Sequence, residues 1–153
     1  MTKKNQIKII LDGKQIFCTP EETILQVAQR NDIKIPTLCH HPDFKIKGNC
    51  RVCVVEIKGR EKLVTACSTK VKSGMEVVTN SKKVKESRNL NIELIFSEHI
   101  QECAVCIWSV NCPLLKLARD YDSKVTRFKD RKSRRTVHKF ANAVEIDGSQ
   151  CID

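Results

Sequence analysis

Residues 48–56 read Gly-Asn-Cys-Arg-Val-Cys-Val-Val-Glu, a close cysteine pair that runs directly into an apolar, β-branched stretch. The C-x2-C spacing of Cys50 and Cys53 lets both sulfurs point at one centre, and thiolates suit both zinc and iron–sulfur clusters. Cys39 and Cys67 lie further out on either side. Because structural zinc sites usually combine two close pairs, a single pair favours a loop wrapped around a two-iron cluster. A zinc site and four cysteines buried as small apolar residues are the alternatives.

A second group follows the pattern H-x3-C-x2-C-x5-C. Its members are His99, Cys103, Cys106 and Cys112. A 4Fe–4S cube needs four protein ligands, and the histidine completes a set that three cysteines leave short. The same donors fit a zinc site, and a lone histidine near a helix end is commonly a cap or a surface group. Trp108, inside the last gap, is expected either to shield the cluster or to pack in a core.

The cysteine content also bears on the compartment. Nine cysteines in 153 residues are odd in number, which argues against a closed disulfide set. The short run Ile7–Leu11 contains Lys8 and does not resemble a secretory signal, and no segment has the length of a membrane span. We therefore expect a cytoplasmic protein, or one on the cytoplasmic face of a membrane complex, where thiols stay reduced and bind metal. Cys18 is expected to be a small buried residue in a strand.

Residues 1–80 predict a small domain with a hairpin, a helix, a cysteine-rich loop and further strands. Asp12-Gly13 is a hairpin-turn pair. Thr19–Glu22 and Thr23–Gln26 both fit a capping box that would start a helix, which should end near Asn31. The expected strands are Ile7–Leu11, Gln15–Cys18, Val52–Ile57, Leu63–Ala66 and Met75–Thr79. This order is that of a β-grasp sheet with a helix across one face, so we expect an α+β fold.

Residues 81–122 predict a small helical domain. Apolar residues at helical spacing run from Val84 to Ile100, up to the second cysteine group, and Pro113–Tyr121 predicts another short helix. Residues 123–153 predict a connector, with a strand at Ala141–Ile146.

The connector carries much of the net charge of +10. Eight Lys or Arg stand against one acid between Lys124 and Lys139. A solvated connector and a surface that docks protein partners are the two leading interpretations. No motif that reads DNA or RNA accompanies the charge, so we expect no nucleic-acid partner.

Together these residues resemble a known family. Pro36–His41, Gly48–Glu56, Ala66-Cys67 and Cys112–Ala118 look like the N-terminal iron–sulfur region of a group that contains the large iron–sulfur subunit of respiratory complex I (the NADH dehydrogenase), iron-only hydrogenases and NAD-linked formate dehydrogenases. The resemblance implies a β-grasp, ferredoxin-like 2Fe–2S domain followed by a small helical 4Fe–4S domain. It implies two ligand sets, Cys39, Cys50, Cys53 and Cys67 for the 2Fe–2S cluster, and His99, Cys103, Cys106 and Cys112 for the 4Fe–4S cluster.

Two features test the resemblance near its ends. Ile100-Gln101-Glu102 departs from the residues that relatives commonly carry between the histidine and the first cysteine, although the ligand spacing is kept. Cys151 stands where the next domain of the relatives opens with ferredoxin-like cysteines. Cys151 is therefore a candidate ligand of a third cluster, with a stray terminal cysteine as the alternative.

The sequence offers no catalytic site of its own, since it has no phosphate-binding glycine loop and no nicotinamide fingerprint. We expect the electron-transfer part of an oxidoreductase, which relays electrons from a flavoprotein partner to a catalytic domain. The terminal acceptor implied by the resemblance is quinone, protons or formate chemistry. A zinc-stabilised basic protein that binds nucleic acid, and a soluble ferredoxin that works alone, are the rival hypotheses.

Overall fold

The computed structural model describes residues 6–129, 137–141 and 143–147. The chain divides into two compact units, Met1–Arg88 and Asn89–Asp153, and the division falls within a single helix, α2 (Lys82–Ser97). The expected α+β class is confirmed. In the described part of the chain, no helix combines the length and the apolar character that crossing a membrane requires.

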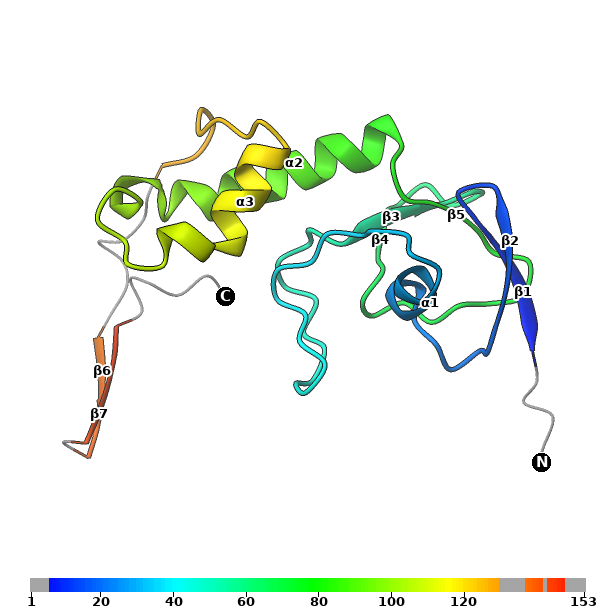
Figure 1. Ribbon diagram of the computed structural model, residues 1–153, viewed down its shortest axis with the longest axis horizontal. Coiled ribbons are helices and arrows are strands. Elements are labelled where there is room, and N and C mark those ends of the chain that lie inside the picture. The colour runs from blue at the N-terminus through cyan, green and yellow to red at the C-terminus, as the bar shows by residue number, and fades with distance from the viewer. Residues whose placement is uncertain (1–5, 130–136, 142, 148–153) are drawn as a thin grey trace. The chain divides into compact units, whose positions relative to one another are not determined.

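The first unit is built on a five-stranded mixed sheet (Figure 1). Its strands are β1 (Ile7–Leu11), β2 (Lys14–Cys18), β3 (Val54–Ile57), β4 (Val64–Thr65) and β5 (Glu76–Val78), in the spatial order β2-β1-β5-β3-β4. β1 pairs with β5 in parallel, whereas the other neighbours are antiparallel. A hairpin whose first strand pairs in parallel with the last strand is the β-grasp arrangement expected from the sequence.

The first hairpin forms where the sequence predicts it. Asp12 and Gly13 both adopt positive φ, +48° and +82°, as a two-residue type I′ turn requires. The Asp12 carboxylate also accepts a hydrogen bond of 2.7 Å from the backbone N–H of Thr79. This contact ties the turn to the residue that follows β5.

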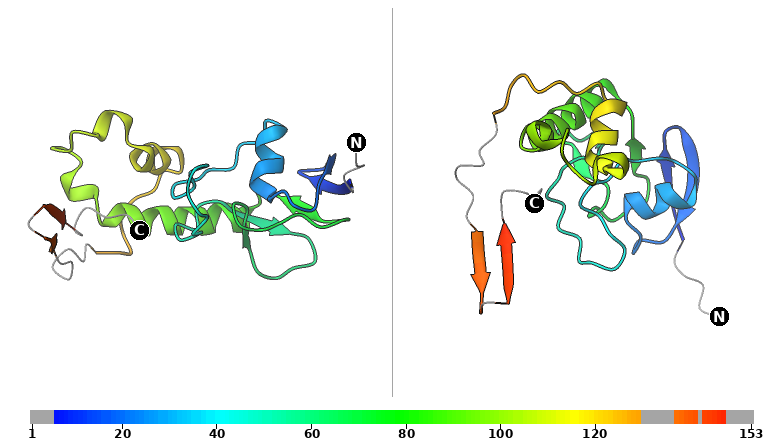
Figure 2. Two further views of the ribbon diagram at one scale, coloured as in Figure 1. Left: turned by 90° about the horizontal axis from the view of Figure 1, so that it is seen from below. Right: turned by 60° about the vertical axis from the view of Figure 1, so that its left-hand side comes forward.

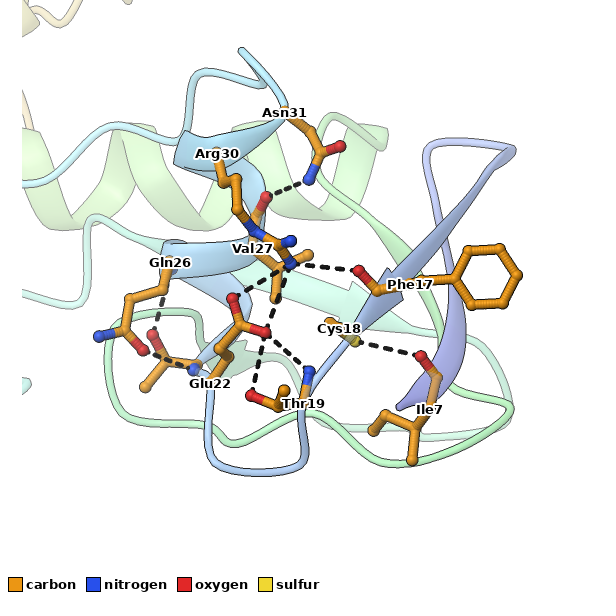
Figure 3. A network of polar contacts seen from close by, with 10 residues as sticks. Ile7, Phe17, Cys18, Thr19, Glu22, Gln26, Val27, Arg30 and Asn31 are labelled. Atoms are coloured by element: carbon orange, nitrogen blue, oxygen red, sulfur yellow. Dashed lines mark hydrogen bonds and ion pairs between the residues drawn. The ribbon is translucent and has the colours of Figure 1, made fainter. Parts of the chain in front are cut away.

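Helix α1 (Ile24–Arg30) starts at the second of the two predicted capping boxes (Figure 3). The Thr23 hydroxyl accepts from the N–H of Gln26 at 3.2 Å, and the Gln26 side chain accepts from the N–H of Thr23 at 2.9 Å. Thr19 and Glu22 also pair, because the Glu22 carboxylate accepts from the Thr19 N–H at 2.7 Å. The earlier box therefore braces the turn before the helix.

The core of the first unit lies between α1 and the sheet (Figure 2). The buried face of α1 consists of Ile24, Leu25, Val27 and Ala28. These side chains pack in one cluster with alternate residues of the strands, such as Ile9 and Leu11. Cys18 is 2% exposed and belongs to this cluster, which confirms that it is a small buried residue.

The chain between α1 and β3 has no regular secondary structure and projects away from the sheet (cyan in Figure 1). Strand β3 begins at Val54, two residues later than predicted, because Val52 and Cys53 belong to a turn. This loop carries three of the four cysteines of the first group.

The second unit contains the end of α2, two short 3-10 helices and α3 (Pro113–Asp120). α2 ends at Ser97, and a 3-10 turn at Ile100–Glu102 takes the place of its predicted last turn. Figures 1 and 2 both show α3 beside the second half of α2. Leu114 and Ala118 of α3 and Ile92 and Phe96 of α2 are buried.

The second unit also holds a two-stranded hairpin. β6 (Val137–Phe140) pairs antiparallel with β7 (Val144–Asp147). The expected strand at Ala141–Ile146 is corrected, because residues 141 and 143 lie in the turn and the strand begins at Val144. Strand β6 was not predicted. Its residues, Val137, His138, Lys139 and Phe140, do not alternate between apolar and polar types, and all four are exposed.

Candidate metal centres

The first cysteine group comes together from two loops. Cys39, Cys50 and Cys53 lie on the loop between α1 and β3, and Cys67 follows β4. The Sγ atoms of Cys53 and Cys67 are 3.4 Å apart. Cys50, Cys53 and Cys67 are buried, and Cys39 is half-buried. The structure thus gathers side chains that are up to 28 positions apart in the sequence.

Backbone geometry around Cys50 directs amide groups at the sulfur atoms. The Cys39 sulfur accepts hydrogen bonds from the backbone N–H groups of Cys50 and Asn49. Gly48 and Arg51, on either side of these two residues, adopt positive φ of +71° and +54°. A left-handed residue before and after the pair bends the chain, and Gly48 does so without the steric cost of a Cβ. Amide groups aimed at ligand sulfurs help to set the potential of a cluster.

The sulfurs of this group also influence one another electrostatically. Burial is the largest cause that raises the pKa of the Cys67 thiol to about 12, and the Cys53, Cys39 and Cys50 sulfurs contribute to the same shift. Burial likewise raises the pKa of Cys39, whereas the hydrogen bond from the Cys50 backbone lowers it and the Cys50 sulfur raises it. Four thiolates this close repel one another, so their ionised forms need a compensating positive charge. Iron supplies such a charge, which makes the donor set suitable for a thiolate-bound cluster.

The second group lies between α2 and α3. Burial raises the pKa of Cys103, and the charges of Cys112 and Cys106 raise it further, so the three sulfurs lie within electrostatic reach of one another. The Cys103 thiol donates to the carbonyl oxygen of His99 at 3.5 Å. The Nε2 atom of His99 is shielded from solvent. The predicted donors therefore occupy one turn-rich segment, with the histidine directly before it.

Cys112 has a second role as the N-cap of α3. Its sulfur accepts a hydrogen bond of 3.5 Å from the N–H of Leu115, and Pro113 occupies the first turn of the helix. A helix N-terminus carries partial positive charge and favours an anionic group. This position therefore suits a thiolate ligand.

Not every expectation for the second group holds. Trp108 is 72% exposed, so the expectation that it packs in a core is wrong. Its expected role in shielding a cluster stays a prediction.

Cys151 lies outside the described residues. Within residues 6–129, 137–141 and 143–147, no three His, Cys, Asp or Glu side chains are placed to hold a single metal ion. The fit to clusters rests on the soft donors and on the proximity of their sulfurs.

Comparisons with known proteins show which cofactors the chain carries. The sequence profile of a 2Fe–2S iron–sulfur cluster binding domain matches residues 4–82, just over half of the chain. The chain belongs to this family. The profile of the NADH-ubiquinone oxidoreductase-G iron–sulfur binding region matches residues 88–127. The 2Fe–2S family member therefore carries a 4Fe–4S cluster as well, and it is an iron–sulfur electron-transfer module. These matches set aside the zinc alternatives.

Relatives of this 2Fe–2S family member are parts of larger redox enzymes. The mitochondrial 78 kDa subunit of NADH-ubiquinone oxidoreductase from Candida albicans is 30% identical over 149 residues, which cover 96% of this chain and 21% of that subunit. The NADPH-Fe(3+) oxidoreductase subunit alpha from Geobacter sulfurreducens is 34% identical over 146 residues, 95% of this chain and 17% of that subunit. The chain thus spans about a fifth of the length of these relatives.

A solved structure shows the same fold. In the crystal structure of a NAD+-reducing NiFe hydrogenase in the H2-reduced state, one chain superposes with a TM-score of 0.81 and 29% identity. The match covers 95% of this chain and 62% of that chain. The confirmed resemblance extends from the ferredoxin-like sheet through the second cysteine group.

Two buried charged residues near the candidate sites were not predicted from the sequence. Arg88 is 2% exposed and donates a hydrogen bond of 2.8 Å to the carbonyl oxygen of Val54. It stands in one buried stripe of α2 with Val84, Ile92 and Phe96, all spaced by four residues. A charged residue within an apolar helical stripe is the signal that could have revealed it, because buried charges need polar partners.

Glu93 is the second missed residue. Its carboxylate accepts from the backbone N–H groups of Thr126 and Arg127 at 2.8 and 2.7 Å, and it pairs with the Arg127 guanidinium at 2.7 Å. The pKa of Glu93 is lowered to about 2. The largest cause is the hydrogen bond from the backbone N–H of Thr126. Residues 126–127 are thereby fixed to α2.

Proposed function

We propose that this chain relays single electrons from a flavin-bearing partner subunit that oxidises NAD(P)H to a catalytic domain. The observation that carries the proposal is the sorting of seven cysteine sulfurs and one imidazole into two groups, each within a region matched by its own iron–sulfur profile. The names of the relatives, an NADH-ubiquinone oxidoreductase subunit and an NADPH-Fe(3+) oxidoreductase subunit, support nicotinamide-linked chemistry in the partners.

The first four ligands would be Cys39, Cys50, Cys53 and Cys67. The proximity of the Cys53 and Cys67 sulfurs supports this set. The amide groups that point at Cys39 support it too. When bound, a cluster of this type accepts and gives up one electron at a time. The residues of the chain hold the sulfurs in a buried site, keep water away and aim amide dipoles at them.

The second ligand set would be His99, Cys103, Cys106 and Cys112. The histidine brings a neutral donor in place of a thiolate, and the N-cap position of Cys112 offers a positive helix terminus to an anionic sulfur. The protein contributes one neutral imidazole and three thiolates, and this combination of charges helps to set the reduction potential of the site.

The proposal includes a domain division. Residues 1–80 would form the 2Fe–2S domain and 81–122 the 4Fe–4S domain. Residues 123–153 would connect to a third cluster region in which Cys151 is a ligand. The proposed place of action is the cytoplasm or the cytoplasmic face of a membrane complex, beside flavoprotein and catalytic partners.

The proposal is tested on the full chain purified without oxygen. Iron and acid-labile sulfide should both be present, and reduction with dithionite should produce two separate EPR signals. Cys50→Ser should remove one signal and Cys106→Ser the other. After co-purification with a flavin-bearing subunit from its host, NADH or NADPH should reduce both centres.

A colourless protein that contains zinc would contradict the proposal. So would two EPR signals that neither NADH nor NADPH produces in the co-purified complex, since the relay would then lack its electron source.

A further inference from the structure

The loop that carries the second cysteine group exposes its apolar side chains. Val105, Ile107, Trp108 and Val110 are 81%, 84%, 72% and 89% exposed. They lie in the same loop as Cys103, Cys106 and Cys112, each of which is half-buried. The cysteines of the loop are thus partly covered, while the large apolar side chains between them are exposed to solvent.

This loop is also uncharged. Residues 103–112 contain no Lys, Arg, Asp or Glu, although these types make up 30% of the chain. Water-exposed apolar clusters are unfavourable in a free protein and mark contact surfaces. Depletion of charge together with aromatic residues is the composition of the centre of an interface.

We propose that residues 103–112 form the docking surface for a partner redox subunit whose contact face is apolar and uncharged. The absence of charge on the loop indicates this partner face, because an acidic face would lose its hydration there without gaining an ion pair. The inference rests on the proposed function, and it adds where the partner binds and what its surface is like.

The placement has a functional consequence for the sulfurs. A partner seated on Val105, Trp108 and Val110 covers Cys103, Cys106 and Cys112 from solvent. The basic residues between Lys124 and Lys129 can steer an acidic protein at long range, whereas the loop makes only short-range contacts. The loop therefore fits a subunit that stays bound, in keeping with the more hydrophobic interfaces of permanent complexes.

The inference is tested by photo-crosslinking in the host. A photoreactive phenylalanine analogue replaces Val110 in the tagged full chain, and in a control it replaces Phe17, which is 61% exposed on β2 of the other unit. Mass spectrometry of the adduct from position 110 should identify a flavin-, cluster- or metal-bearing subunit, and position 17 should give no such adduct.

A matched pair of substitutions measures the contribution of the surface. Trp108→Ser should reduce the recovery of that subunit about tenfold, because tryptophan at an interface centre commonly contributes more than 1 kcal/mol. Phe17→Ser, an equal loss of an exposed aromatic ring, should leave recovery unchanged. Iron, sulfide and EPR signals are measured on both variants.

Several results would overturn the inference. They are an adduct only with a second copy of the chain, no adduct from position 110, or co-flotation of the chain with phosphatidylethanolamine–phosphatidylglycerol vesicles that Trp108→Ser abolishes. If both clusters are present and are reduced by NADH or NADPH, such a result overturns the docking surface alone. If the clusters are absent, the proposed function falls with it.

Discussion

The guanidinium of Arg88 donates a hydrogen bond of 2.8 Å to the carbonyl oxygen of Val54, the residue that directly follows Cys53. A buried positive charge is therefore fixed at the first residue of β3, directly after a proposed cluster ligand. Charges in a protein interior are screened far less than charges on the surface.

Arg88→Met is expected to lower the reduction potential of the 2Fe–2S cluster. Reduction adds a negative charge, which the buried guanidinium favours and methionine does not. The measurement is an EPR-monitored redox titration of the full chain. Lys85→Met removes an equal charge from an exposed position of the same helix and should leave the potential unchanged. An unchanged or higher potential in Arg88→Met would contradict this expectation.

Glu93→Gln should destabilise the chain by about 1.5–3 kcal/mol at pH 7, the usual contribution of hydrogen bonds to a charged group. The folded-state pKa of Glu93 is lowered to about 2 from 4.5. Its stabilising contribution is thus complete above pH 4.5 and is lost as the pH falls toward 2. Urea denaturation, followed by circular dichroism, should show that the difference in the free energy of unfolding between wild type and Glu93→Gln becomes smaller as the pH falls across that window.

The exposed Glu86 of the same helix offers the control for this experiment. Glu86→Gln should change the free energy of unfolding by less than about 0.5 kcal/mol. If the difference in the free energy of unfolding between wild type and Glu93→Gln stays constant from pH 7 to pH 3, Glu93 does not act through its charge.

His99→Cys should lower the potential of the 4Fe–4S cluster, provided that the cluster assembles. A thiolate adds negative charge beside the iron and stabilises the oxidised state, as the higher potentials of histidine-ligated two-iron centres illustrate. The 2Fe–2S signal in the same titration serves as the internal reference. A potential that rises or does not move would argue that His99 is not a ligand.

Cys53→Ala should reduce the iron content from about six to about four atoms per chain, since it removes a ligand of the two-iron cluster and leaves the other cluster intact. Cys18→Ala is the matched control, because Cys18 is equally buried, at 2% exposure, and belongs to neither group. Iron analysis and EPR report both variants. Equal iron losses in the two would indicate a general folding defect.

The sequence predicts the local features of this protein well. The hairpin turn and the start of α1 are encoded in short patterns of turn and capping residues, and the spacing of the cysteines predicts the two groups of donors. Arg88 and Glu93 were missed because their importance depends on contacts with Val54 and Thr126, more than thirty residues away.

The exposure of Trp108 could not be predicted from its neighbours in the sequence either. Whether an aromatic residue in a cysteine loop is covered depends on what packs over that loop, and neighbouring residue types do not reveal it. Strand β6 was missed for a related reason, since it buries no face and therefore lacks the alternation that identifies a strand.

The parallel pairing of β1 with β5 joins Ile10 to Glu76, so the sheet closes only when its last strand has been synthesised. A ribosome-bound chain that has emerged as far as Cys67 already possesses all four thiols of the first group, yet it lacks the strand that lies between β1 and β3. Delivery of iron and sulfide to this site by the assembly machinery of the cell should therefore follow translation of the whole first unit, because the long-range pairing must form first.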